Sequence, residues 1–157
     1  MTALSHPLLK LSISAVAALT LAIPAAEAAG SHYYGRWTVS DDNPVFTARG
    51  RPYRTIDVAP CGKDFCGVSV GERGECGPTL FRFFARRSAD DMLRGHGRWG
   101  TAKKNVVIYN YENGDEANAR TLELYLGDGY DFGDRSDNMP KFHANYRKSA
   151  EATCRTG

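Results

Sequence analysis

Few side chains beyond residues 1–28 have the type and spacing that catalysis needs. The histidines there are His32, His96 and His143, and no serine stands in the G-x-S-x-G context of a nucleophile elbow. His96 lies between two glycines, and the spacing places no carboxylate beside it that would make it a general base. We therefore expect that none of these residues is catalytic and that the protein is not an enzyme.

Four acids recur at intervals of three in a glycine-rich stretch, at Asp128, Asp131, Asp134 and Asp137. Carboxylate oxygens are the ligands that Ca²⁺ prefers, so this run is a candidate calcium site. The run lacks the alternating acids and the closing glutamate of an EF-hand, and solvated loops are commonly acidic. We therefore expect a solvated loop without a metal, with calcium as the alternative.

Residues 95–100 read Gly-His-Gly-Arg-Trp-Gly and match the G-x-G-x-x-G pattern of dinucleotide-binding loops letter for letter. That pattern indicates a nucleotide site only between a buried strand and a helix. Neither element is predicted beside these residues. The sequence therefore predicts no nucleotide and no other cofactor.

The first 28 residues have the order of a cleavable secretory signal. Lys10 precedes an apolar run over 11–23, and the Ala-Glu-Ala triplet at 26–28 fits the A-x-A cleavage rule. The alternative is a membrane anchor, but the apolar run is shorter than the roughly 20 residues that a spanning helix needs. We expect a signal peptide over 1–28 and one mature domain over 29–157, in the periplasm or outside the cell.

All four cysteines lie in the predicted mature domain, at Cys61, Cys66, Cys76 and Cys154. An even number of cysteines in an exported chain indicates disulfides, and four cysteines allow three pairings. The short interval between Cys61 and Cys66 suits a bridge across a tight turn, which leaves Cys76 for Cys154. The alternative is a zinc site, but the chain has no C-x2-C or H-x3-H spacing.

The formal net charge of +2 argues against a dedicated nucleic-acid binder. The arginines nevertheless cluster, at Arg49, Arg51 and Arg54, and again at Arg82, Arg86, Arg87, Arg94 and Arg98. These clusters suit an anionic ligand or a glycolipid surface. An ordinary solvated face in an arginine-rich chain is the simpler interpretation, and we favour it.

Past Gly30 the apolar residues recur with the period of strands. The predicted strands cover 33–39, 54–59, 68–70, 79–85, 104–111, 120–126 and 141–147, and turn-forming residues separate nearly every pair. One short helical turn is expected near 88–93, with Ser88 as its cap. This pattern predicts an all-β antiparallel meander that closes into a barrel or a sandwich.

Several short motifs occur in a fixed order along the predicted mature domain. They are Gly35-Arg36-Trp37-Thr38, Val58-Ala59-Pro60-Cys61-Gly62, Phe65-Cys66-Gly67-Val68, Gly97-Arg98-Trp99 and Ile108-Tyr109-Asn110 followed by Asn113-Gly114. In this order they resemble a bacterial family of exported, lipocalin-like domains of unknown function. The resemblance implies a single antiparallel up-and-down β-barrel. Tyr111 stands where that family usually has proline, and Cys76 and Cys154 are additional.

In such a barrel Gly35 would let the first strand bend, while Trp37 would close the floor and Trp99 would pack in the core. A barrel of about eight strands is either filled by side chains or holds one small ligand. The residues expected to line the interior and to contact any ligand there are Phe81, Phe83, Val107, Tyr109, Leu122 and Leu124.

These features predict a non-catalytic exported barrel that binds a small apolar or amphipathic ligand or an envelope component. The alternative is an inhibitor or interaction protein that acts on a protease or lysozyme. Small disulfide-bonded barrels that open with a G-x-W strand also resemble the metalloprotease-inhibitor family. A cavity of several hundred cubic ångströms would favour the first function, and a filled barrel with a rigid projecting loop would favour the second.

Overall fold

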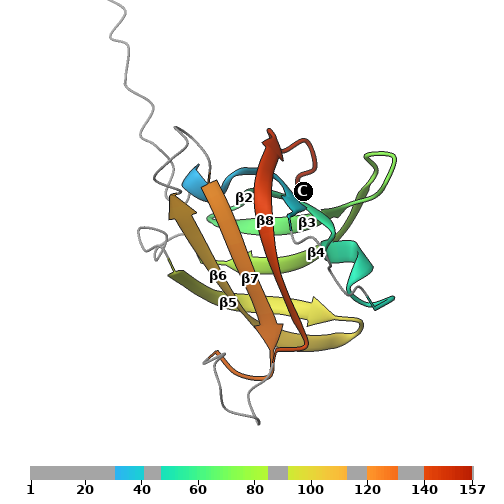
Figure 1. Cartoon of the computed structure of the whole chain (residues 1–157), viewed down its shortest axis with the longest axis vertical. Helices are drawn as coiled ribbons and strands as arrows, with labels where there is room; N and C mark the ends of the chain where they lie inside the picture. Colours follow the sequence, from blue (N-terminus) through green and yellow to red (C-terminus); the bar gives the residue numbers. More distant parts are fainter. Residues whose placement is uncertain (1–30, 41–46, 85–91, 113–119, 131–139, 157) are drawn as a thin grey trace, which may run out of the picture.

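The structure is a computed structural model that describes residues 31–40, 47–84, 92–112, 120–130 and 140–156. Its strands are β1 (Gly35–Val39), β2 (Thr55–Cys61), β3 (Asp64–Val70), β4 (Cys76–Phe83), β5 (Met92–Trp99), β6 (Ala102–Glu112), β7 (Arg120–Gly127) and β8 (Phe142–Ala150). Each strand pairs antiparallel with the next, and β8 pairs with β1 to close the barrel (Figure 1). The predicted all-β up-and-down barrel is confirmed. Two 3-10 turns, η1 (Ser31–Tyr33) and η2 (Arg51–Tyr53), precede β1 and β2.

The sequence did not predict β5. The helical turn expected near 88–93 lies outside the described residues except for Met92 and Leu93, and these two residues begin β5. Gly95 and Gly97 interrupt the alternation of apolar side chains in β5, so its strand period is hidden in the sequence. The predicted signal peptide over 1–28 also lies outside the described residues.

Large side chains fill the barrel interior. The largest that are fully buried are Trp37, Tyr33, Tyr53, Tyr146, Phe65, Phe81 and Phe83. The Trp37 indole donates a hydrogen bond to the Tyr33 carbonyl oxygen at 2.8 Å, and the Tyr146 hydroxyl donates one to the Tyr53 carbonyl oxygen at 2.6 Å. A ligand-sized cavity would leave accessible surface on its walls, and these side chains have almost none. The described core is therefore packed.

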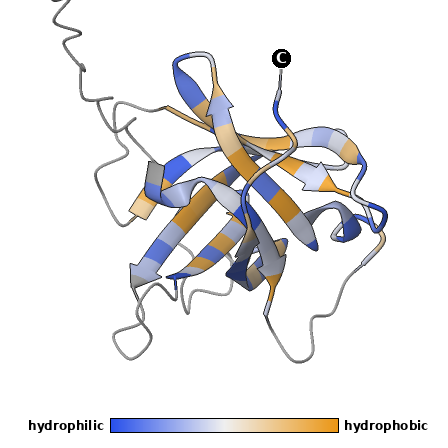
Figure 2. Ribbon diagram, turned by 90° about the horizontal axis from the view of Figure 1, so that it is seen from above, coloured by the Kyte–Doolittle hydropathy of each residue, from blue (hydrophilic) through white to orange (hydrophobic). Residues whose placement is uncertain are grey.

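Four of the six predicted lining residues belong to this core, namely Phe81, Phe83, Leu122 and Leu124. Val107 and Tyr109 are not part of this cluster, although Val107 is fully buried and Tyr109 is half-buried. Val106 and Ile108 are the inward residues of β6, so Val107 and Tyr109 point outward because side chains alternate along a strand. The four consecutive apolar residues at 106–109 concealed which pair faced the core. The alternation of apolar and polar residues along other strands is visible in Figure 2.

Gly35 lies where β1 and β8 cross closely, and Trp99 packs against the edge of the core. Gly35 has a φ of 142°, and a Cβ there would lie 3.2 Å from the Ala150 carbonyl oxygen and would overlap the Lys148 side chain. Glycine thus permits the close crossing of β1 and β8. Trp99 is half-buried, and its ring packs against Tyr53 and Phe142 with centroids 6.4 and 6.1 Å apart.

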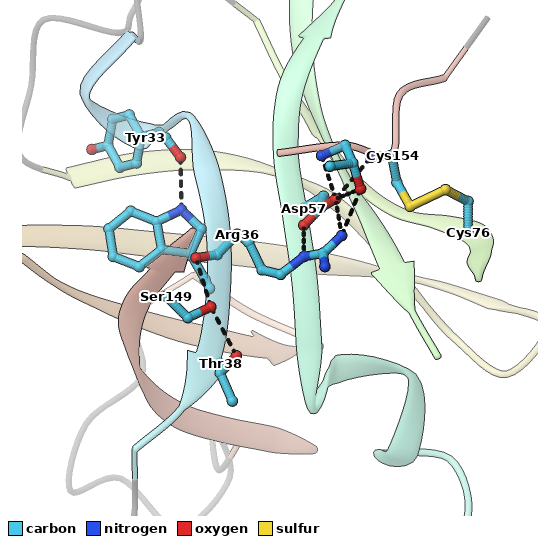
Figure 3. A network of polar contacts seen from close by, with 9 residues as sticks. Tyr33, Arg36, Thr38, Asp57, Cys76, Ser149 and Cys154 are labelled. Carbon is cyan, nitrogen blue, oxygen red and sulfur yellow. Dashed lines mark hydrogen bonds and ion pairs between the residues drawn. A yellow bond between two sulfur atoms is a disulfide. The ribbon is translucent and has the colours of Figure 1, made fainter. Parts of the chain in front are cut away.

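Two disulfides tie the chain together, and both join the predicted partners. Cys61–Cys66 connects the end of β2 to β3, and Cys76–Cys154 connects the start of β4 to the segment that follows β8. Cys154 packs with Val68 and Val70 of β3. The C-terminal segment therefore lies across the outside of the barrel (Figure 3).

Asp57 of β2 holds this segment by hydrogen bonds. Its buried carboxylate accepts bonds from the Arg36 guanidinium at 2.7 and 2.9 Å and from the backbone amides of Thr153 and Cys154 at 2.8 Å (Figure 3). Burial raises the pKa of Asp57, but the hydrogen bonds from Arg36, Cys154 and Thr153 outweigh it and the net pKa lies below its ordinary value. The carboxylate therefore has a structural position between β1, β2 and the C-terminal segment.

Candidate functional site

The barrel wall is weakest between β4 and β5. Within the described residues these strands pair only through Phe81 with Gly97 and Arg82 with His96, whereas β5 and β6 pair along the whole of β5. Pro78 contributes to this opening because proline has no N–H to donate to a neighbouring strand. The register of β4 against β3 is also irregular around it. We call the open junction of β4 and β5 the seam.

Two glycines of β5 bring the strands close where they do pair. A Cβ on Gly95 would lie 2.5 Å from the Arg82 carbonyl oxygen, and one on Gly97 would overlap the Val106 side chain and lie 3.1 Å from the Leu80 carbonyl oxygen. The two glycines of the G-x-G match thus serve strand crossing and core packing. The motif lies within β5 with a turn after it, which is not the context of a nucleotide loop.

A cavity of about 350 Å³ opens on the outside of the barrel at the seam. We call it the seam cleft. Leu80 and Phe81 of β4 contribute to its lining although they are only 4% and 2% exposed, and its rim carries cationic side chains. The residues that line it are Thr79, Leu80, Phe81, Arg82, His96, Gly97, Arg98, Thr101 and Lys103. An apolar surface beside cationic groups suits a ligand that is both apolar and anionic.

A second cavity, of about 280 Å³, adjoins the seam cleft and shares His96 and Lys103 with it. We call it the polar chamber. Its other lining residues are Lys104, Asn105, Gly127 and Asp128, from β6, β7 and the turn after β7. Because the two cavities share His96 and Lys103 in their linings, they are neighbours on the barrel surface, one with an apolar part and the other polar.

The electrostatics of this region are positive. Arg82 pairs with Asp64 at 2.6 Å, and Lys104 pairs with Asp128. No carboxylate among the described residues pairs with Arg98 or Lys103, and both are exposed. The hydrogen bond from Lys104, together with the charges of Lys104 and Lys141, holds the pKa of Asp128 below its ordinary value.

His96 carries a polar atom that lacks a protein partner. Its Nδ1 is buried and has no hydrogen-bond partner in the described structure. Buried polar atoms in folded proteins are nearly always satisfied, so an atom without a partner beside two cavities is a candidate ligand contact. His96 lies opposite Arg82 of β4 and Asn105 of β6 in the sheet register.

A cluster of aromatic and ionisable groups lies elsewhere, on the outer face of β6 to β8. The Glu123 carboxylate accepts hydrogen bonds from the Tyr125 hydroxyl at 2.6 Å and the Tyr111 hydroxyl at 3.2 Å, and it contacts His143 Nε2 at 2.7 Å. The Tyr125 and His143 rings stack with centroids 4.1 Å apart. Burial and the nearby Glu123 raise the pKa of Tyr111 to about 12.

This cluster places a histidine and a carboxylate in contact. Neither cavity described above includes Glu123 or His143. A raised pKa makes Tyr111 a poorer source of a nucleophilic phenolate at neutral pH. Glu123 accepts several hydrogen bonds that fix its surroundings, so the geometry favours a structural cluster.

The other predicted site residues have these positions. Asp128 contacts Lys104, while Asp131, Asp134 and Asp137 lie outside the described residues, so the calcium alternative stays untested. Among the described residues no three histidine, cysteine, aspartate or glutamate side chains are grouped as metal ligands. The His32 carbonyl oxygen accepts a hydrogen bond from Asn110 at 3.0 Å.

The sequence indicated only part of the seam region. Its second arginine cluster contains Arg82 and Arg98, which both line the seam cleft. Leu80, Lys103 and Lys104 were missed as site residues. The available signals were Pro78, which disfavours full strand pairing, and the glycines of β5. A cleft formed by the end of strand pairing depends on register, which neither signal specifies.

Comparisons with known proteins identified no relative of this chain. Within the described residues, no helix is long and apolar enough to cross a membrane. The chain matches no protein-family model, no curated protein and no solved structure.

Proposed function

We propose that this protein is an exported, non-catalytic binding protein that holds an anionic amphipathic ligand in the seam cleft, on the outside of its barrel. The observation that carries the proposal is the cleft itself, where Leu80 and Phe81 lie beside the cations Arg98 and Lys103. Apolar surface supplies binding free energy of about 25 cal/mol per Å² buried, and the cations select a negative head group.

The packed core supports a site on the outer wall. Trp37, Phe83 and Leu124 are fully buried against their neighbours, so a ligand could enter the interior only by displacing close-packed side chains. Displacing such side chains costs several kcal/mol each, by analogy with core substitutions. The seam cleft needs no such displacement because its volume is already open to solvent.

Three features support the export part of the proposal. Residues 1–28 have the order of a secretory signal. All four cysteines are in disulfides, which persist in oxidising compartments. The motif order resembles an exported lipocalin-like family. Export is tested by the mass of the protein recovered from the periplasm, which should lack residues 1–28; recovery of the uncleaved chain from the cytoplasm would contradict it.

Binding is tested with 8-anilinonaphthalene-1-sulfonate, an anionic amphipathic dye whose fluorescence rises in apolar sites. We expect saturable binding to the wild-type protein and a loss of affinity of at least about tenfold in the Arg98→Gln/Lys103→Gln double variant. Both side chains are exposed, and the Arg98 carbonyl oxygen, which accepts the Tyr53 hydroxyl, is unchanged by the substitution.

The matched control is Lys63→Gln, which removes an exposed cation at the turn between β2 and β3. This variant should bind the dye like the wild type. Undiminished binding by the double variant, or no binding by the wild type, would rule out the seam cleft as the site.

A second candidate function is that of an inhibitor or interaction protein. The turn between β3 and β4, residues 71–75, is closed by Gly71 and Glu75, which join by a backbone hydrogen bond at 2.8 Å, and it projects from the barrel (Figure 1). The adjacent Cys76–Cys154 disulfide fixes its base. A rigid projecting loop on a filled barrel is the arrangement that favours this function. Formation of a stable complex with a protease or lysozyme, lost on deleting residues 72–74, would identify it.

A further inference from the structure

We infer that the ligand's head group is a phosphate monoester, which occupies the polar chamber while its hydrocarbon part lies in the seam cleft. This inference rests on the proposed function and assigns the chemical class of the ligand and its orientation. It derives from the adjacency of two cavities with different linings and from the charge around the smaller one.

The shared wall gives the ligand its direction. His96 and Lys103 line both cavities, so a molecule that passes between them has one end against Leu80 and Phe81 and the other beside Lys104 and Asn105. The first end includes Leu80 and Phe81, and the second carries two lysines and the Asn105 amide, which donates to the Asp128 carbonyl oxygen at 3.0 Å. An amphipathic molecule can satisfy both ends only with its head in the polar chamber.

The charge of the polar chamber selects a dianion. The ammonium groups of Lys103 and Lys104 line it, and Lys141 lies close enough to act on Asp128, which is the one carboxylate of the lining. Among the described residues, these three cations against one carboxylate leave an excess of two positive charges. A phosphate monoester carries about −1.5 to −2 at neutral pH and three acceptor oxygens, whereas a carboxylate or sulfate ester carries a single charge.

The ion pair of the chamber strengthens this choice. Asp128 is 63% exposed and Lys104 is 18% exposed, so an incoming phosphate can take the Lys104 ammonium while Asp128 turns to solvent. Tetrahedral phosphate oxygens can accept from several such donors at once.

Isothermal titration calorimetry with decyl phosphate, decyl sulfate and inorganic phosphate tests this inference at low ionic strength. The assay is run at about pH 8, above the second phosphate pKa of about 6, so that the monoester is a dianion. We expect decyl phosphate to bind at least about tenfold more tightly than decyl sulfate, and inorganic phosphate to bind far more weakly than decyl phosphate.

Lys104→Gln should remove most of the preference for phosphate over sulfate, and Lys63→Gln should preserve it. The Lys104→Gln variant loses one surface ion pair, so its fold is checked by circular dichroism before titration.

Each other outcome has a definite meaning. Equal binding of decyl phosphate and decyl sulfate, or a full phosphate preference in Lys104→Gln, would overturn the head-group assignment and leave the seam cleft as a binding site. Equal binding of inorganic and decyl phosphate would show a free-anion site and overturn the orientation. Failure of both decyl compounds and of the dye to bind would overturn the proposed function as well.

Discussion

Asp57 shows how a single buried charge organises this protein. Its carboxylate has no solvent access, and its bonds to Arg36, Thr153 and Cys154 join three parts of the chain that are far apart in sequence. Removing one partner of a buried ion pair is strongly destabilising because the other charge and the backbone donors lose their acceptor. Asp57 therefore secures the C-terminal segment together with the Cys76–Cys154 disulfide.

Asp57→Asn should lower the free energy of unfolding by about 3 kcal/mol at neutral pH. Because the folded pKa of Asp57 is depressed, its stabilisation is present above the ordinary aspartate pKa of about 3.9 and is lost as the pH falls through the folded pKa. The difference in the free energy of unfolding between wild type and variant should thus shrink from pH 7 toward strong acid. Urea unfolding at several pH values measures it.

The control for this prediction is Asp64→Asn. Its partner Arg82 is 57% exposed, so the loss should be at most about 1 kcal/mol. If the free energies of unfolding of Asp57→Asn and wild type differed by the same amount down to strong acid, the stabilising role of the Asp57 charge would be contradicted.

At the scale of elements, the pairing of β4 with β5 decides where the barrel opens. The strands approach closely at Gly95 and Gly97 and diverge toward Pro78. Where β4 and β5 lie close together, Phe81 and Phe83 fill the interior. Where the two strands separate, the seam cleft opens on the outside. The same pair of strands therefore accounts for both the packed core and the candidate site.

Gly97→Ala should destabilise the protein by about 1–3 kcal/mol, because the new methyl group overlaps Val106 and approaches Leu126 at 3.1 Å in a packed core. Thermal or urea unfolding measures the change. The control is Gly71→Ala, where the methyl group meets only the flexible Glu75 side chain and the loss should stay within about 0.5 kcal/mol. Equal losses in the two variants would show that the close crossing of β4 and β5 is unimportant.

At the scale of the whole molecule, closure of the barrel and two disulfides stabilise a small domain. Loop entropy assigns about 4.5 kcal/mol to Cys76–Cys154, which spans 78 residues, and about 2 kcal/mol to Cys61–Cys66, which spans 5. The longer bridge also holds the C-terminal segment over β3, where Cys154 packs with Val68 and Val70. The covalent frame and the packed core together stabilise a barrel whose interior is filled.

The fold was largely predictable because its determinants are local. Alternation in β2 and β7, the turn residues between strands and the cysteine spacing each report a feature of a short segment. The facing of Val107 and Tyr109 was not predictable, since both faces of that part of β6 carry apolar residues. The seam cleft was not predictable, because its position depends on the register between β4 and β5. That register is set by packing across the barrel.

Whether the barrel was filled or hollow also lay beyond the sequence. The same apolar residues could surround a ligand or pack on one another, and the choice depends on how Trp37, Tyr53 and Tyr146 meet in the interior. Tyr53 comes from η2, outside any predicted strand, so its contribution to the core was not anticipated.

Methyl ¹H–¹³C NMR during a titration with 8-anilinonaphthalene-1-sulfonate tests most directly whether the ligand binds at the seam and outside the core. Thr79 and Thr101 line the seam cleft, whereas Leu122 and Leu124 lie in the packed interior. We predict that saturable shift changes concentrate on the methyl groups of Thr79 and Thr101. Changes concentrated on Leu122 and Leu124 would contradict the account, because they would show that the ligand enters the barrel.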